Sequence, residues 1–131
     1  RGDLLDHVID RYADFFMIGG IMLSPYSRHM SLGIVALLGV FMTSYMGTQA
    51  QALGVKRDYG GVLGRADRLV LLISVPLLQF ILISIGVVPE IPIPWLFPIN
   101  LIEMMLIWFA VAGNLTAVQR AMRIWKALEE K

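Results

Sequence analysis

The chain has 131 residues, of which 57% are hydrophobic and 16% are charged, and its mean hydropathy is +0.70. Average soluble domains contain roughly 45–50% apolar and about 25% charged residues, so this composition indicates an integral membrane protein. The formal net charge of +1 says nothing about partners. Because cysteine is absent, a disulfide framework, a zinc ribbon and thiol catalysis are excluded, and any metal must be held by oxygen or imidazole ligands.

Four apolar segments are long enough to cross a membrane, since a hydrocarbon core of about 30 Å needs roughly 20 helical residues. They cover residues 4–23, 31–53, 68–86 and 98–120. Their apolar runs are continuous rather than alternating, which disfavours spanning β-strands. We therefore predict an all-α integral membrane protein with four transmembrane helices in this chain. The proline-rich stretch VVPEIPIPWLFP cannot continue a helix and can lie at the interface beside Trp95.

Basic residues predict the orientation of these helices. They gather at the amino end, in the loop between the second and third segments, and at the carboxyl end, whereas the two other turns carry only Arg28. Because Lys and Arg accumulate on the cytoplasmic side of short loops, the three basic regions should share the cytoplasmic face. Lys56 and Arg57 in the middle loop are expected to be solvated residues of this kind, although they could also contribute to an acceptor site.

The first segment carries aspartates at helical spacing, namely Asp3, Asp6, Asp10 and Asp14. At about 100° per residue they lie within about 80° of one another on one helix face, which we call the aspartate stripe. An aspartate in the middle of a membrane helix costs roughly 2.5–3.5 kcal/mol, so the stripe predicts a functional site. The carboxylates repel one another, and a bound hard divalent cation would compensate them. We expect His7 to point away from the stripe.

Two of the aspartates have simpler explanations. Asp3 could cap the amino end of the helix and interact with its macrodipole. Asp14 could pair with Arg11 or with a basic residue of another helix. Asp6 and Asp10 lie inside the helix at the membrane boundary, and neither explanation accounts for them.

The stripe contains a recognisable motif. Gly2, Asp6 and Asp10 read as G-x3-D-x3-D, which resembles the second half of the signature D-x2-D-G-x2-A-R-x8-G-x3-D-x3-D of the CDP-alcohol phosphotransferases. The resemblance extends over most of the chain through Arg11 and the stretches SYMGTQAQALG, GRADRLVLL and GNLTAVQR. SYM…ALG and GRADRL are most similar to phosphatidylinositol phosphate synthases and archaetidylinositol phosphate synthases.

This resemblance implies a six-helix membrane bundle with the signature at its cytoplasmic end, in the cell membrane. Residues 1–131 would be the C-terminal part of such a domain, without the upstream D-x2-D-G-x2-A-R half. The chain does not begin with methionine either, so we expect it to be a fragment of a longer protein. Family members are commonly dimers, which predicts a homodimer, and small residues such as Gly39 and Gly113 could permit close helix packing.

The implied reaction transfers a phosphatidyl or archaetidyl group from a CDP-linked lipid to a polyol phosphate such as inositol 1-phosphate, and releases CMP. By the match to the motif, Asp6 would bind Mg²⁺, or alternatively Mn²⁺, with two ions per site. Asp10 would be the general base and could also contact metal. Gly2 would allow close approach of backbone or nucleotide.

Acceptor binding would use the next segments. Arg65 and Arg68, at i and i+3, could face one pocket and hold a phosphate. Ser44 corresponds to a position used for the acceptor phosphate in inositol-phosphate-using relatives. Gly47 and Gln49 stand where basic residues are frequent, which removes positive charge from the expected pocket. Glycerol 3-phosphate is therefore an alternative acceptor, and the lipid could be based on diacylglycerol or archaeol.

Two other classes of protein are considered. An ion or proton transporter would carry polar groups through the membrane, yet none follows in residues 15–23. A membrane scaffold would not explain Asp6 and Asp10 together with a basic pair. Nucleic-acid binding has no support, because the basic residues follow the membrane boundaries.

Overall fold

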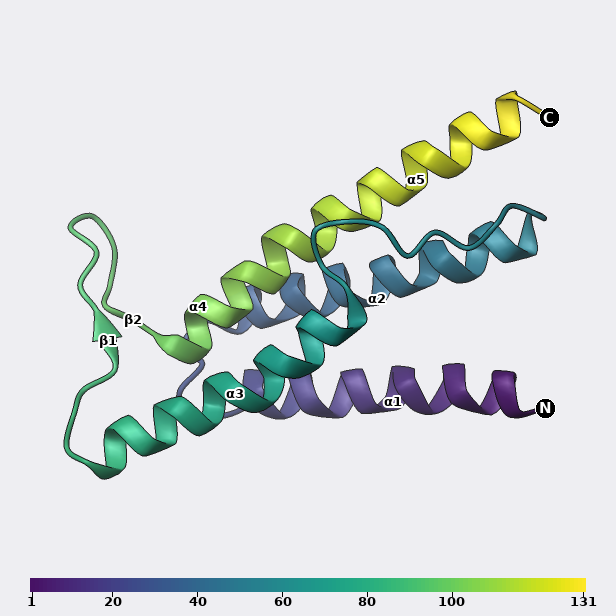
Figure 1. Ribbon diagram of the computed structural model, residues 1–131. Helices are drawn as coiled ribbons and strands as arrows, with labels where there is room; N and C mark the ends of the chain where they lie inside the picture. Colours follow the sequence, from purple (N-terminus) through teal and green to yellow (C-terminus); the bar gives the residue numbers. More distant parts are fainter.

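A computed structural model describes all of residues 1–131 and contains four long helices (Figure 1). The first three are α1 (Gly2–Met22), α2 (Met30–Ala52) and α3 (Arg65–Ser84). The fourth is continuous through α4 (Leu101–Trp108), the π-helical turn η1 (Phe109–Gly113) and α5 (Asn114–Glu129). A two-residue antiparallel ladder, which the sequence did not predict, pairs β1 (Glu90–Ile91) with β2 (Ile99–Asn100). The all-helical prediction is confirmed apart from this ladder.

Three of the four helices are long and apolar enough to cross a membrane by length and composition. They are Met30–Ala52, Arg65–Ser84 and the composite helix Leu101–Glu129. These spans indicate a multi-pass membrane protein. The helix α1 has 21 residues, which is long enough, but it is not among these three. Its aspartate stripe and Arg11 place too many charges within the length of a membrane span.

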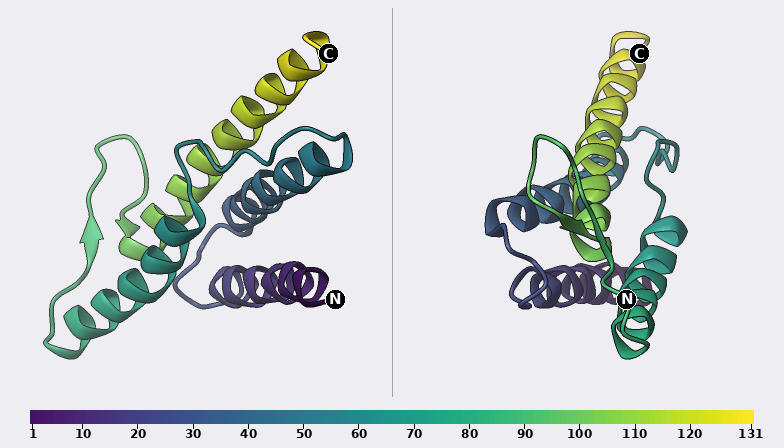
Figure 2. Two further views of the ribbon diagram at one scale, coloured as in Figure 1. Left: turned by 45° about the vertical axis from the view of Figure 1, so that its right-hand side comes forward. Right: turned by 90° about the vertical axis from the view of Figure 1, so that its left-hand side faces the viewer.

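The two ends of the bundle differ in composition. Both termini lie at one end together with the loop that follows α2, and the β1–β2 connector lies at the other (Figure 1; left view of Figure 2). We call the first the basic end, because it holds the basic regions identified in the sequence, and the second the hairpin end. The common placement of the three basic regions agrees with the orientation that the positive charges predict.

Packing is centred on α2, which contacts α1, η1 and α5, while α3 packs against α4. The fully buried side chains of this core include Ile18 on α1, Val40 on α2, and Leu106 and Phe109 on the composite helix. Burying such a side chain contributes about 1.5–3 kcal/mol when water is the alternative. These contacts fix the position of α1, and therefore of the aspartate stripe, relative to α2.

The backbones of α2 and η1 approach each other closely. A Cβ atom on Gly113 would lie 2.9 Å from the carbonyl carbon of Gly39, so only glycine fits there without a shift. The hydroxyl oxygen of Thr43 lies 2.8 Å from the carbonyl oxygens of both glycines and donates its proton between them. The amide of Asn114 donates to the carbonyl of Val35 at 3.2 Å. The predicted close packing at Gly39 and Gly113 thus occurs within the bundle.

Candidate functional site

A polar cavity of about 300 Å³ opens at the basic end, among the amino-terminal half of α1, the carboxyl end of α2 and the beginning of α3. It is lined by five of the six site residues predicted from the sequence, Asp6, Asp10, Ser44, Arg65 and Arg68. Gly2 does not line it, and a Cβ atom there would meet nothing within 4 Å. The structure therefore gathers residues from three helices into one cavity.

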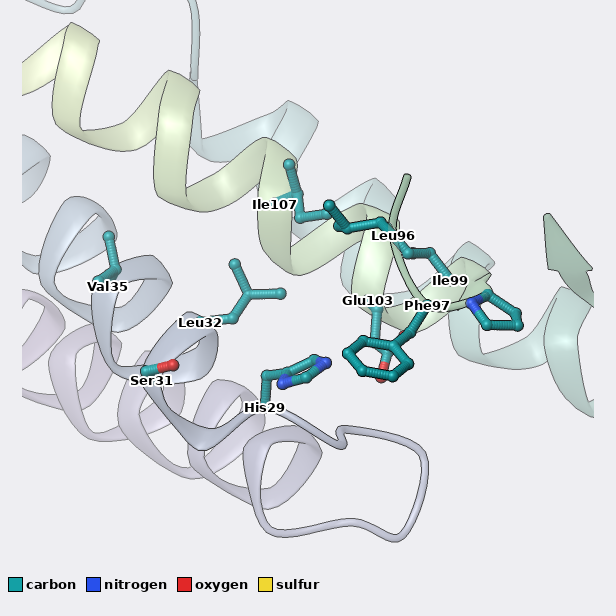
Figure 3. A pocket seen from close by; sticks show the side chains of 10 residues that line it. His29, Ser31, Leu32, Val35, Leu96, Phe97, Ile99, Glu103 and Ile107 are labelled. Carbon is teal, nitrogen blue, oxygen red and sulfur yellow. The ribbon is translucent and has the colours of Figure 1, made fainter. Parts of the chain in front are cut away.

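A larger cavity of about 490 Å³ lies at the hairpin end, between the start of α2 and the connector (Figure 3). Most of its lining is apolar, including Leu32, Phe97 and Ile107. Its one carboxylate, Glu103, is already engaged by Arg28 at 3.0 Å. Charged groups available for chemistry are therefore found at the basic end.

The aspartate stripe faces the arginines of α3. Asp10 forms an ion pair with Arg65 at 2.6 Å. Deeper along α1, the buried Asp14 pairs with Arg68 at 3.1 Å and with Arg11 at 3.0 Å. Both partners predicted for Asp14 are therefore present. The prediction that Arg65 and Arg68 face one pocket is also confirmed, and their place in the first turn of α3 explains why they converge.

Two expectations for the first turns of α1 are wrong. The helix begins at Gly2, so Asp3 lies in the first turn and makes no side-chain capping bond. It lies instead 3.4 Å from Nε2 of His7, and both residues line the cavity. Residues at i and i+4 share a helix face, so His7 belongs to the stripe rather than pointing away from it. Asp6 makes no ion pair, which leaves its carboxylate available.

Three arginines of the cavity, Arg120, Arg57 and Arg11, were not among the site residues predicted from the sequence. Arg120 is buried, and its guanidinium donates to the carbonyls of Thr43 at 2.7 Å and Gly60 at 3.0 Å. Arg57 also lines the cavity, whereas its neighbour Lys56 is exposed and does not. The solvated position expected for both loop residues is therefore correct for Lys56 and wrong for Arg57. The sequence did contain a signal for Arg120, because this residue ends the stretch GNLTAVQR that resembles the family.

The loop between α2 and α3 is attached to α5. The buried Leu63 donates its backbone N–H to the hydroxyl of Thr116 at 3.0 Å. Asp58 pairs with Arg123 at 2.6 Å and accepts from the N–H of Gly60 at 2.7 Å. Desolvation acts to raise the pKa of Asp58, but the bonds from Gly60 and Arg123 outweigh it and hold that pKa below its usual value. These contacts hold the loop over the cavity.

The carboxylates of the cavity fit part of a divalent-cation site. Asp6 and Asp10 lie one helical turn apart in the cavity, and carboxylate oxygens are the ligands that Mg²⁺ prefers. No group of three or more His, Asp or Glu side chains in residues 1–131 is arranged to hold a metal ion. The chain thus offers two carboxylates of suitable chemistry on α1.

The chain is distantly homologous to archaetidylinositol phosphate synthase from Methanothermobacter thermautotrophicus, with 26% identity over 128 residues. The alignment covers 98% of this chain and 57% of the relative, so the chain spans little more than half of the relative's length. This homology confirms the resemblance to CDP-alcohol phosphotransferases, the family of that enzyme. No protein-family model and no solved structure matches the chain.

Proposed function

We propose that residues 1–131 form the C-terminal part of the membrane domain of a CDP-alcohol phosphotransferase. The reaction transfers a phosphatidyl or archaetidyl group from a CDP-linked lipid to a polyol phosphate and releases CMP. One observation carries this proposal: a single cavity at the basic end holds the motif residues Asp6 and Asp10 together with Arg65 and Arg68. The homology over nearly the whole chain supports it.

In this reaction the acceptor hydroxyl oxygen forms a bond to the lipid-linked phosphorus while the bond from that phosphorus to the CMP oxygen breaks. Asp10 is the proposed base that takes the hydroxyl proton. Its carboxylate is held by Arg65 in the structure. An acceptor phosphate that attracts Arg65 would release the carboxylate, so acceptor binding and base availability would be coupled.

Asp6 and Asp10 are the residues of this chain that would hold Mg²⁺, with Mn²⁺ as the alternative. A divalent ion bound there would neutralise pyrophosphate charge. Because two carboxylates are too few for two ions, we propose that further aspartates come from two additional helices of a six-helix bundle. The cavity would face the cytoplasm, since it lies at the basic end.

For the acceptor, Arg65, Arg68 and Ser44 provide donors that suit a phosphate monoester. The name of the relative favours an inositol phosphate, with glycerol 3-phosphate as the alternative. The lipid is proposed to be diacylglycerol- or archaeol-based, and the protein to act as a homodimer. An ion or proton path is disfavoured, because no ionisable side chain follows Asp14 on α1.

The test is an assay of the purified full-length protein with radiolabelled CDP-lipid and a panel of polyol phosphates. We expect CMP release that depends on both the acceptor and Mg²⁺. Asp6→Asn should shift the midpoint of the Mg²⁺ titration to higher concentration, because the amide is a weaker ligand. Absence of CMP release with every acceptor, from protein that is folded and supplied with Mg²⁺, would reject the proposed reaction.

A further inference from the structure

The arginine of the α2–α3 loop occupies space that a glycine leaves open. A Cβ atom built on Gly47 would lie 3.2 Å from Nε of Arg57 and 3.5 Å from its Cζ. Gly47 is itself buried on α2. The guanidinium of Arg57 therefore lies where a side chain at position 47 would begin, and a larger residue there would displace it.

The guanidinium of Arg57 contacts an imidazole, an amide and a phenol ring, and none of these partners is a carboxylate. Nη1 of Arg57 lies 3.2 Å from Nε2 of His7 and donates to Oε1 of Gln51 at 3.1 Å. The ring of Tyr59 lies 5.5 Å from Cζ, within cation–π distance. Nε is buried and has no hydrogen-bond partner. A buried donor without a partner is rare in folded proteins and indicates that an acceptor belongs there.

Nε of Arg11 and Nε of Arg68 are also buried without a partner, but other nitrogens of these two guanidiniums contact a carboxylate. Arg65 pairs with Asp10, and Arg68 shares Asp14 with Arg11. No ion pair in the chain includes Arg57. The cavity thus has a cation on its α2 side whose charge is not balanced by a contacting carboxylate.

We propose that Arg57 binds the phosphate group of the acceptor and so contributes to acceptor specificity, an inference that rests on the proposed function. A guanidinium offers planar paired donors that match a phosphate, and an anion would supply the missing partner of Nε. The proposed metal ligands Asp6 and Asp10 lie on α1, where the pyrophosphate of the CDP-lipid must stay. The guanidinium of Arg57 lies beside Gly47 on α2. The acceptor phosphate, the second anionic group, would therefore bind on the α2 side of the cavity.

This assignment changes one expectation from the sequence. Gly47 was expected to remove positive charge from the acceptor pocket. In the structure the space at Gly47 is filled by a guanidinium from ten positions further along the chain. The loop therefore supplies a positive charge at the place where α2 has none.

The first test compares Arg57→Ala with Lys56→Ala in the full-length protein. Both variants remove one positive charge from the same loop, but Lys56 is exposed outside the cavity. We expect Arg57→Ala to raise the acceptor KM about tenfold or more, because the variant loses a hydrogen bond to a charged group. The CDP-lipid KM should change less than about twofold. Lys56→Ala should change neither KM by more than about twofold. Equal increases in both KM values for Arg57→Ala, or a result matching Lys56→Ala, would overturn the assignment.

A relocation variant separates binding from a structural role of Arg57. Adding Gly47→Arg to Arg57→Ala returns a guanidinium to the same part of the cavity from α2. We expect this double variant to recover most of the acceptor KM, because the role belongs to the charge rather than to the loop contacts. No recovery, in a double variant with the thermal stability of Arg57→Ala, would mean that Arg57 acts by holding the loop.

Binding of inorganic phosphate provides a readout that does not depend on turnover. Phosphate should raise the thermal unfolding temperature of wild type and Lys56→Ala at matched ionic strength, and Arg57→Ala should lose most of that shift. Equal shifts in all three proteins, or no shift in wild type, would reject a phosphate site at Arg57. An Arg57-dependent shift in a protein that releases no CMP would instead reject the reaction and keep the site.

Discussion

The two ends of the bundle both concentrate charged side chains, but they use them differently. At the hairpin end, Arg28 contacts Glu103 at 3.0 Å, Glu90 at 3.3 Å and the carbonyl of Pro98. Asn100 accepts from the N–H of Glu103 at 2.9 Å and so caps α4. The buried carboxylate of Glu103 therefore has its charge and its acceptors satisfied within the chain.

At the basic end the same kinds of residue leave groups without partners. Asp6 has no ion pair, and Nε of Arg57 has no hydrogen-bond partner although it is buried. These groups line a cavity of about 300 Å³ rather than a closed contact. The comparison indicates that density of charge does not identify a site, because a satisfied cluster stabilises the fold and an unsatisfied one is available for a ligand.

The largest effect is expected at Asp10. Asp10→Asn keeps the size of the side chain but cannot accept the proton of the acceptor, so turnover should fall by about 10²–10⁴, the usual contribution of a general base. Because Asp10 lies in the open cavity, thermal stability should change little. CMP release is the measurement, made in matched detergent. Turnover within tenfold of wild type would remove Asp10 from the role of base.

The complementary change at the hairpin end should affect stability and not the reaction. Glu103→Ala removes a buried carboxylate and leaves Arg28, which is 40% exposed, without its main partner, so the thermal unfolding temperature should fall. Glu90→Ala is the control, because that partner of Arg28 is itself 36% exposed, so its loss should lower the unfolding temperature less than Glu103→Ala does. Thermal unfolding measures both. A specific rise in the acceptor KM from Glu103→Ala would break the distinction between the two ends.

Arg65 and Arg68 sharpen the comparison within the basic end. The side chains of Arg68 and Asp14 are each 3% exposed, so Arg68→Ala would leave a buried aspartate with only Arg11 and should lower stability by roughly 2–3 kcal/mol. Arg65 is 56% exposed, so Arg65→Ala should raise the acceptor KM severalfold and leave stability within about 1 kcal/mol. Arg68→Lys, which keeps the charge without the planar fork, should recover part of the stability. Identical behaviour of the two alanine variants would contradict this division.

Much of the fold followed from local features of the sequence. The apolar segment predicted at residues 31–53 corresponds to the helix Met30–Ala52, because continuous apolar runs of this length specify a membrane helix. The fourth helix continues to Glu129 rather than stopping at residue 120, since its last turns are charged but still favour a helix. The π-helical turn η1 was not predicted, because it depends on the close contact with α2.

Helical periodicity also predicted part of the candidate site, because the spacing of the aspartates and of Arg65 and Arg68 fixes which helix faces they share. Arg57 could not be assigned in this way, since the path of its loop depends on contacts with α5. The pairing of Arg28 with Glu103 joins residues 75 positions apart, which no local pattern specifies. The error at His7 was different in kind, because its position four residues after Asp3 already places both on one face.

The smallest effect is expected in the loop that carries Arg57. Bonds from Gly60 and Arg123 hold the pKa of Asp58 below its usual value, despite the opposing effect of desolvation. A carboxyl group whose pKa is lower in the folded state contributes stability above its unfolded pKa of about 3.9 and loses it as the pH falls through the folded value. Asp58→Asn should therefore lower the free energy of unfolding at pH 7 slightly, by no more than about 1 kcal/mol for this partly exposed pair. The difference from wild type should shrink below about pH 4, when the wild-type carboxyl also becomes neutral. A difference that stays constant from pH 7 to pH 3 would show that the ionised carboxylate of Asp58 does not hold the loop against α5.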